Sequence, residues 1–146
     1  MSMKTMKAID ALQEAQKIAF APFLFQATVS LRKLGILDLI FEKRMIGGVT
    51  IEEIAKELSI SVYGVGVLLE IAESSNIVIK DNENKYELTK IGYFLNSNET
   101  AGVNINFTND VCYKGLYHLT ESIKNGKPEG LKELGNWPTI MKDYLN

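Results

Sequence analysis

Apolar and polar residues alternate with a helical period along the first part of the chain. Ile9, Leu12, Ala15 and Ala19 recur at intervals of three or four residues, a spacing that predicts an amphipathic helix over residues 4–20. In a protein, most of the stability of such a helix comes from packing its apolar face against another element. The start of the chain therefore predicts a helix that needs a neighbour.

A second predicted helix is apolar on nearly every side. Pro22 suits the first turn of a helix and disfavours the helical conformation in the residue before it, so we expect the first helix to end there and a second to begin. The second helix runs from about Pro22 to Leu34 and stops at Gly35. A small monomer has little surface with which to cover it, which predicts a homodimer. Its apolar side chains are Phe23, Leu24, Phe25, Ala27, Val29, Leu31 and Leu34.

The middle of the chain predicts a helix-turn-helix. A short helix through residues 37–41 is followed by Gly47-Gly48, a pair that marks a loop. Thr50 and Glu53 have the spacing of a capping box and open the next helix. After a turn, Ser61 can cap a further helix with one apolar side. That side consists of Val65, Leu68, Leu69 and Ala72.

A β-hairpin is predicted after the helix-turn-helix. Residues 77–80 and 85–88 are short strands around a polar tip, with Tyr86 and Leu88 inward, and Thr89 can cap another helix. A helix-turn-helix followed by a hairpin is the order of elements in a winged helix. We therefore predict a mainly α fold, a winged helix-turn-helix with a small β-hairpin wing, flanked by N- and C-terminal dimerisation helices.

The last third of the chain is predicted to contain one long helix. A polar segment, residues 96–100, precedes a helix from about Thr108 to Lys124, which Asn125-Gly126-Lys127-Pro128 ends. Residues 131–146 are expected to form a short helix and a trailing turn. We divide the chain into N-terminal dimerisation helices at 1–41, a winged-helix module at 42–100 and a C-terminal helical segment at 101–146.

The amino-acid composition excludes several classes of function. The chain is 46% hydrophobic and 23% charged, and its formal net charge of -2 does not indicate a general nucleic-acid binder. The single cysteine, Cys112, cannot form an internal disulfide, and the single histidine, His118, leaves too few ligands for a zinc site made by the protein alone. No stretch has the length of a membrane span or the pattern of a signal peptide. We expect a cytoplasmic protein with no metal and no membrane partner.

The predicted recognition helix of the winged helix has the wrong charge for DNA. Lysine and arginine are absent between Lys56 and Lys80, and residues 50–90 hold four lysines against eight acidic residues, a net charge of -4. Since contacts to phosphate supply much of the affinity for DNA, we expect no nucleic-acid partner. The outward side carries Tyr63, Gly66, Val67, Glu70 and Ser74. The alternative is a dimeric winged-helix transcription regulator that compensates with Arg32, Lys33, Lys43 and Arg44.

No group of residues has the arrangement of a catalytic site. His118 has no serine or aspartate in a recognisable order around it, and Cys112 lies among apolar neighbours, so we interpret both as structural. Gly64-Val65-Gly66 follows a turn and not a strand, and Leu69 stands where a dinucleotide fingerprint has its third glycine. We therefore predict neither a catalytic residue nor a cofactor site in this chain.

Aromatic and polar residues share one side of the predicted C-terminal helix. Asn106, Phe107, Asp110, Tyr113 and Tyr117 are spaced so that they can face one way, which gives the mixture that the wall of a small-molecule pocket needs. The alternative is that the aromatic side chains only pack against the winged-helix module.

Several segments, taken in order, form a pattern spread over about a hundred residues. They are Phe25-Gln26-Ala27 with Leu34-Gly35-Ile36-Leu37-Asp38, Thr50 to Leu58 (T-x-E-E-I-A), Tyr86-Glu87-Leu88-Thr89 with Gly92 and Leu95 (Y-x-L-T-x-x-G-x-x-L), and Tyr117-His118-Leu119 with Gly126-Lys127-Pro128. This pattern resembles the N-terminal dimerisation domain of class I S-adenosylmethionine-dependent O-methyltransferases, which include plant caffeic-acid-type and bacterial polyketide enzymes. One departure is Leu116, which stands where the family usually has tryptophan.

The resemblance implies a helical domain that intertwines with its copy in a homodimer and forms part of the wall of the substrate pocket. The family binds S-adenosylmethionine on a Rossmann-like domain that follows, and its catalytic His base lies there. This chain ends before such a domain, so we expect either part of a longer enzyme or a relative without the enzyme half, inactive alone and binding no cofactor. The wall residues are then Phe107, Asp110, Tyr113 and Tyr117, and the dimer interface consists of Ile9, Leu12, Phe20, Phe23, Leu24, Phe25 and Val29.

Overall fold

The structure, a computed structural model, describes residues 6–135 of the chain. The chain divides into two compact units, Met1–Asn98 (the N-terminal unit) and Glu99–Asn146 (the C-terminal unit). Both are mainly helical, and the N-terminal unit also contains a two-stranded antiparallel sheet. None of the described helices is long and apolar enough to cross a membrane.

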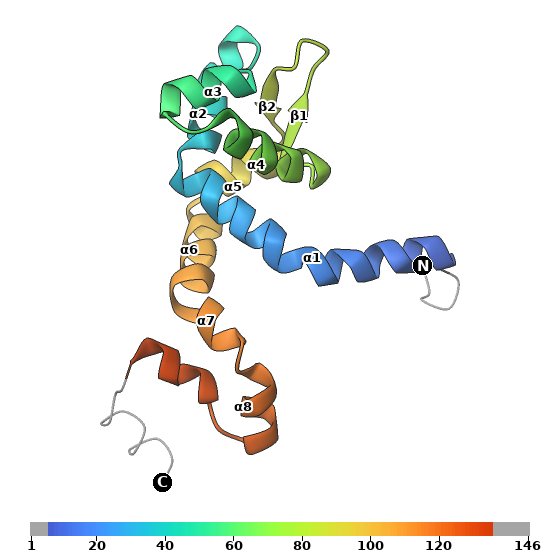
Figure 1. The fold of residues 1–146 in the computed structure, drawn as a ribbon, viewed down its shortest axis with the longest axis vertical. Helices are drawn as coiled ribbons and strands as arrows, with labels where there is room; N and C mark the ends of the chain where they lie inside the picture. Colours follow the sequence, from blue (N-terminus) through green and yellow to red (C-terminus); the bar gives the residue numbers. More distant parts are fainter. Residues whose placement is uncertain (1–5, 136–146) are drawn as a thin grey trace. The chain divides into compact units, whose positions relative to one another are not determined.

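The N-terminal unit consists of helices with a small two-stranded sheet at one side (Figure 1). Its elements are α1 (Ala8–Lys33), α2 (Ile36–Glu42), the 3-10 helix η2 (Lys43–Ile46), α3 (Ile51–Leu58), α4 (Val62–Ser74), β1 (Val78–Lys80), β2 (Tyr86–Leu88) and α5 (Lys90–Ser97). The hairpin was predicted, and its register pairs Val78 with Leu88 and Lys80 with Tyr86. The predicted order of helix, turn, helix and hairpin is therefore present.

Helix α1 is continuous, whereas the sequence predicted two helices that meet at Pro22. The prediction was wrong because proline inside a helix removes one hydrogen bond and kinks the helix without necessarily ending it. Good helix formers, including Ala19, Ala21 and Leu24, continue the pattern on both sides. Figure 1 shows α1 changing direction part-way along its length. Gly35, with a φ of 75°, follows the end of α1, close to the predicted stop.

Among the described residues, the hydrophobic core cluster lies in the N-terminal unit. The second half of α1 packs against α2 and α4, and side chains from α2, α3, α4 and the hairpin complete the core. Gly48 lets the chain pass close to the hairpin, because a Cβ at this position would lie 2.7 Å from the carbonyl oxygen of Tyr86. The largest fully buried side chains are Leu31, Ile36, Leu37, Ile40, Ile54, Leu69, Val49, Val65 and Val78.

The predicted helix caps are confirmed. The backbone N–H of Thr50 donates to Oε2 of Glu53 at 2.8 Å, and the N–H of Glu53 donates to Oγ1 of Thr50 at 3.3 Å, which completes a capping box. Ser61 Oγ accepts a hydrogen bond from the N–H of Gly64 at 3.0 Å. Thr89 caps α5 in the same way. These caps hold the two helices of the helix-turn-helix and the helix after the hairpin at fixed starting points.

The C-terminal unit differs from the single long helix that the sequence predicted. It contains α6 (Glu99–Phe107), the π-helix η3 (Thr108–Cys112), α7 (Tyr113–Leu116), α8 (Leu119–Asn125) and the 3-10 helix η4 (Glu129–Leu134). Helix α6 already begins at Glu99, within the predicted polar segment, and the negative charge of Glu99 favours the helix start. Gly126 ends α8 with a φ of 60°, as predicted. The rest of the predicted C-terminal tail, residues 136–146, lies outside the described residues.

Two glycines bring α7 and η4 into backbone contact. A Cβ on Gly130 would lie 2.5 Å from the carbonyl oxygen of Gly115, and a Cβ on Gly115 would lie 3.1 Å from that of Gly130. No larger residue fits either position without moving the backbone. The close approach explains why the predicted long helix breaks near Tyr117 and His118: the chain turns there so that η4 can fold back onto α7.

Candidate functional site

The first half of α1 is exposed over its whole length. Between Ala8 and Phe23 every residue is exposed except Asp10, which is half-buried. Ile18 is 78% exposed and Phe23 is 67% exposed, and the rings of Phe20 and Phe23 meet edge to face at 5.9 Å. Large apolar side chains exposed together on one helix favour an interaction surface, although polar residues such as Glu14 and Lys17 lie between them. We call these residues, 8–23, the exposed half of α1.

The residues predicted for a dimer interface fall into two groups. Ile9, Leu12, Phe20 and Phe23 are exposed, whereas Leu24 and Phe25 are half-buried and Leu24 packs against the core. Val29 is 5% exposed, because it lies in the buried half of α1 and contributes to the interior of its own chain.

Sequence analysis missed Ile18 as an interface candidate. It lies nine positions after Ile9, about two and a half helical turns, so the two side chains point in opposite directions. Periodicity selects one stripe and therefore does not select Ile18. Its exposure shows that the exposed half of α1 is apolar on more than one side, which suits a helix surrounded by a partner.

The predicted wall residues lie on α6, η3 and α7 in the C-terminal unit. Phe107 and Asp110 are exposed, Tyr113 is half-buried, and Tyr117 is 90% exposed. The π-helix η3 interrupts the regular spacing on which the prediction rested, because it has one more residue in each hydrogen-bonded turn. The residues are therefore spread over three elements of one unit instead of one straight helix face.

His118 lies between two carboxylates of the C-terminal unit. Its Nε2 lies 2.7 Å from Oε1 of Glu133, and its Nδ1 lies 3.4 Å from Oε2 of Glu121. Lys132 reaches the same Glu121 oxygen at 3.4 Å. Cys112 is a half-buried free thiol. Within residues 6–135, no group of three or more His, Cys, Asp or Glu side chains could hold a metal ion.

The only G-x-G segment does not fit an adenosine cofactor. Gly64 and Gly66 lie inside α4, which follows a turn. The N–H of Gly64 already donates to the side chain of Ser61, and a Cβ on Gly66 would meet nothing closer than Ile51 Cδ1 at 3.9 Å. A phosphate- or ribose-binding loop instead needs free backbone N–H groups and glycines that no side chain could replace.

The outward side of α4 carries no cation, as predicted. Tyr63, Val67, Glu70 and Ser74 are exposed there. Nearby cations are engaged with carboxylates of the same module. These pairs are Lys43 with Glu57 at 3.0 Å, Lys80 with Glu73 at 3.6 Å and Lys85 with Glu83 at 3.0 Å. Hydrogen bonding and the charge of Glu83 raise the pKa of Lys85 above its ordinary value.

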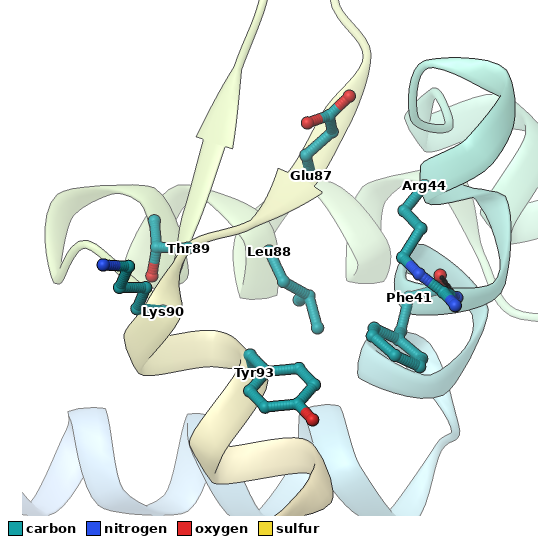
Figure 2. Close-up of a pocket in the computed structure, with 7 residues that line it drawn as sticks. All are labelled: Phe41, Arg44, Glu87, Leu88, Thr89, Lys90 and Tyr93. Carbon is teal, nitrogen blue, oxygen red and sulfur yellow. Dashed lines mark hydrogen bonds between the residues drawn. The ribbon is translucent and has the colours of Figure 1, made fainter.

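A small pocket that the sequence did not predict opens between α2, η2, β2 and α5. Phe41 and Tyr93 contact each other with ring centroids 5.5 Å apart, and Leu88 points toward them (Figure 2). The guanidinium carbon of Arg44 lies 3.8 Å from the centroid of the Phe41 ring. The pocket holds about 240 Å³ and is also lined by Glu87, Thr89 and Lys90. Its residues come from segments more than forty positions apart, which explains why no local pattern indicated it.

Comparison with known families identifies the class of this chain. Residues 12–86, just over half of the chain, match the Dimerisation2-like domain. The chain therefore belongs to the Dimerisation2-like domain family. The match covers the second part of the exposed half of α1, the core and the first residue of β2. No curated protein sequence matches the chain.

Solved structures with the same fold include several methyltransferases. The apo form of the S-adenosylmethionine-dependent methyltransferase SibL has a TM-score of 0.73 at 17% identity, covering 86% of this chain and 37% of that protein. Human N-acetylserotonin methyltransferase in complex with S-adenosylmethionine has a TM-score of 0.72 at 19% identity, covering 95% of this chain and 41% of that protein. The pyocyanin biosynthetic protein PhzM has a TM-score of 0.70 at 16% identity, covering 88% and 38%. The chain thus spans about two fifths of the length of these proteins.

Proposed function

We propose that this chain is the dimerisation and substrate-pocket-wall region of an S-adenosylmethionine-dependent small-molecule methyltransferase. The proposal is supported by membership of the Dimerisation2-like domain family and by the methyltransferases that share its fold. In this proposal the cofactor and the catalytic residues belong to a part of the enzyme outside this chain, since the G-x-G segment of this chain does not fit an adenosine cofactor. In this proposal the chain holds the two subunits of a cytoplasmic homodimer in a fixed arrangement.

The exposed half of α1 is the observation that carries the proposal. Ile9, Leu12, Phe20 and Phe23 are each more than half exposed in the single chain. Removing apolar surface from water contributes about 25 cal/mol per Å², before the cost of association is subtracted. A second copy of the chain, which offers the same apolar helix, is a suitable cover because two identical surfaces can pack symmetrically. Leu24, Phe25 and Ile18 would extend the interface.

The wall of the substrate pocket is the second part of the proposal. Phe107, Asp110, Tyr113 and Tyr117 combine aromatic surface with a carboxylate and two phenol groups, which suits an aromatic acceptor with polar substituents. A π-helix segment, Thr108–Cys112, lies among them, and such segments occur frequently at functional sites. Part of this wall would face the acceptor in the complete enzyme.

The module of residues 42–100 would serve as a scaffold of winged-helix type, between the dimerisation helices at 1–41 and the C-terminal segment at 101–146. Its helices α3 and α4 and its hairpin have the order that a winged helix requires. The alternative, a winged-helix transcription regulator, needs cations on the outward side of α4, where the exposed charge is Glu70. We therefore propose a scaffold and not a DNA reader.

The oligomeric state tests the proposal directly. Light scattering on the 146-residue chain at micromolar concentration is expected to give the mass of a dimer, twice 16.3 kDa. A monomer under these conditions would contradict the proposed role. Fluorescence anisotropy with a DNA duplex at low salt is expected to show no binding, and salt-sensitive micromolar binding would favour the regulator.

Calorimetry with S-adenosylmethionine tests where the cofactor binds. We expect no heat of binding from this chain alone, because its G-x-G segment is capped by its own serine. Binding would show that the chain itself contains a cofactor site and would overturn the division of roles proposed above.

A further inference from the structure

The pocket between α2, η2, β2 and α5 has a preformed aromatic floor. Phe41, Leu88 and Tyr93 each come from a different element, and all three elements are held by the core of the N-terminal unit. The ring of Tyr93 is supported from two directions, by Phe41 at 5.5 Å and by Phe94 at 5.7 Å. A flat ring could lie on this floor without rearrangement of the side chains below it.

Arg44 is held in position at the edge of this floor. One of its guanidinium nitrogens, Nη1, donates to the carbonyl oxygen of Phe41 at 2.7 Å, and its guanidinium carbon lies over the Phe41 ring (Figure 2). The side chain has therefore already lost much of the freedom that binding would otherwise cost. Within residues 6–135, Arg44 forms no ion pair with a carboxylate, and its remaining N–H groups are available to a ligand.

The charges around the pocket favour one negative group on the ligand. Arg44 and Lys90 line it as cations and Glu87 as the single carboxylate, although residues 50–90 as a whole carry a net charge of -4. Among the described residues, neither Lys90 nor Glu87 forms an ion pair. Arg44 can bind a carboxylate with two parallel hydrogen bonds. Glu87 would repel a second negative charge on the same ligand.

We propose that this pocket binds a single-ring aromatic monocarboxylate, with the ring on Phe41, Leu88 and Tyr93 and the carboxylate at Arg44. The size agrees, since a cavity of about 150 Å³ accepts benzene and this pocket of about 240 Å³ leaves room for the carboxylate. An aromatic cation would face Arg44, and an aliphatic acid would leave the aromatic floor poorly covered. The proposal concerns a site distinct from the wall residues and does not rest on the proposed methyltransferase role.

Nuclear magnetic resonance on the isotope-labelled 146-residue chain tests the proposal, with benzoate as the probe. We expect benzoate to shift the amide signals of residues 41–44 and 87–93 saturably. Benzamide, a neutral molecule of the same shape, is expected to bind at least about tenfold more weakly, because a hydrogen bond to a charged group is worth more than one to a neutral group. Cyclohexanecarboxylate tests the aromatic floor and should also bind more weakly.

Matched variants separate the charge of Arg44 from general changes in the protein. Arg44→Gln is expected to weaken benzoate binding at least about tenfold, whereas Lys43→Gln, which removes a neighbouring cation paired with Glu57, should leave it unchanged. Glu87→Gln should strengthen binding, since it removes the one negative charge at the rim. Unchanged dispersion of the amide spectrum verifies that each variant folds.

Three results would overturn the proposal. These are equal affinities for benzoate and benzamide, unchanged benzoate affinity in a folded Arg44→Gln variant, and the absence of saturable shifts with benzoate. None of them depends on the oligomeric state or on S-adenosylmethionine, so the dimerisation proposal would stand or fall separately.

Discussion

The two halves of α1 have similar apolar content and opposite surroundings. In the second half, Ala27, Val29 and Leu31 are buried, and α1 packs against α2 and α4. In the first half, Leu12, Ile18 and Phe23 are exposed. One chain provides a core large enough for half of this helix only. The apolar side chains of α1 therefore have two different roles. Those in the second half stabilise the fold of the chain, and those in the first half are available to a partner.

The strongest test of this comparison is a substitution in the buried half. Leu31→Ala removes a side chain that is 0% exposed, and we expect it to lower the free energy of unfolding by about 2–5 kcal/mol. Urea denaturation at a fixed protein concentration measures the loss. The matched control is Ile18→Ala in the exposed half, which should change the stability of the monomer by less than about 0.5 kcal/mol. Equal losses in the two variants at a concentration where the chain is monomeric would contradict the division of α1.

The next largest effect is expected on association. The double variant Phe20→Glu, Phe23→Glu places two carboxylates where the rings meet, and we expect it to raise the dissociation constant of the dimer at least about a hundredfold, since buried aromatic residues dominate interface energies. Sedimentation velocity over a concentration series measures the change. The control is Ile79→Glu, which adds a carboxylate at an exposed apolar position on β1. A dimer that survives the double variant with its affinity unchanged would exclude the exposed half of α1 as the interface.

Local signals in the sequence predicted most of the N-terminal unit. The caps at Thr50, Ser61 and Thr89 were correct because a cap depends on residues only three positions apart. Gly126 likewise ends its helix within one turn. Such features depend on residues within one helical turn, and a single sequence therefore contains the information needed to find them.

Features that depend on distant contacts were missed. Val29 is 5% exposed within its own chain, whereas its periodicity placed it in the dimer interface. The break after α7 depends on Gly130, which lies fifteen positions beyond Gly115. The pocket at Arg44 needs residues from η2 and β2 together. The periodicity of apolar residues within one segment contains no information about contacts between distant segments.

The C-terminal unit extends the comparison, because it has almost no apolar interior of its own. Gly102 is the only buried residue among its described positions. Its order depends on local contacts, and the backbone approach of Gly115 to Gly130 is one of them. Gly130→Ala should lower the stability of the C-terminal unit by about 1–3 kcal/mol, because the new Cβ would lie 2.5 Å from the carbonyl oxygen of Gly115.

Hydrogen exchange of the amides in α7, α8 and η4 measures this cost, and the N-terminal unit should be unaffected. Gly66→Ala serves as the control, since its Cβ has space and alanine favours a helix by up to about 1 kcal/mol over glycine. Unchanged protection in the Gly130→Ala variant would show that the contact between α7 and η4 does not hold this unit together.

The smallest expected effect concerns pH and the self-contained N-terminal unit. The N–H of Thr50 donates to the carboxylate of Glu53, and this hydrogen bond holds the pKa of Glu53 below its ordinary value. Because the folded state favours the ionised form, the capping box contributes stability that is present above the ordinary pKa of a glutamate. This stability is lost as the pH falls through the lowered value. Glu53→Gln keeps the acceptor oxygen without titrating, so its stability should fall less than that of the natural chain between about pH 5 and pH 3. Thermal unfolding over this range measures the difference.

Because Glu53 belongs to the unit that folds on its own core, the difference should be the same at concentrations that favour monomer and dimer. Parallel pH profiles for the two proteins would show that the capping box does not link folding to protonation.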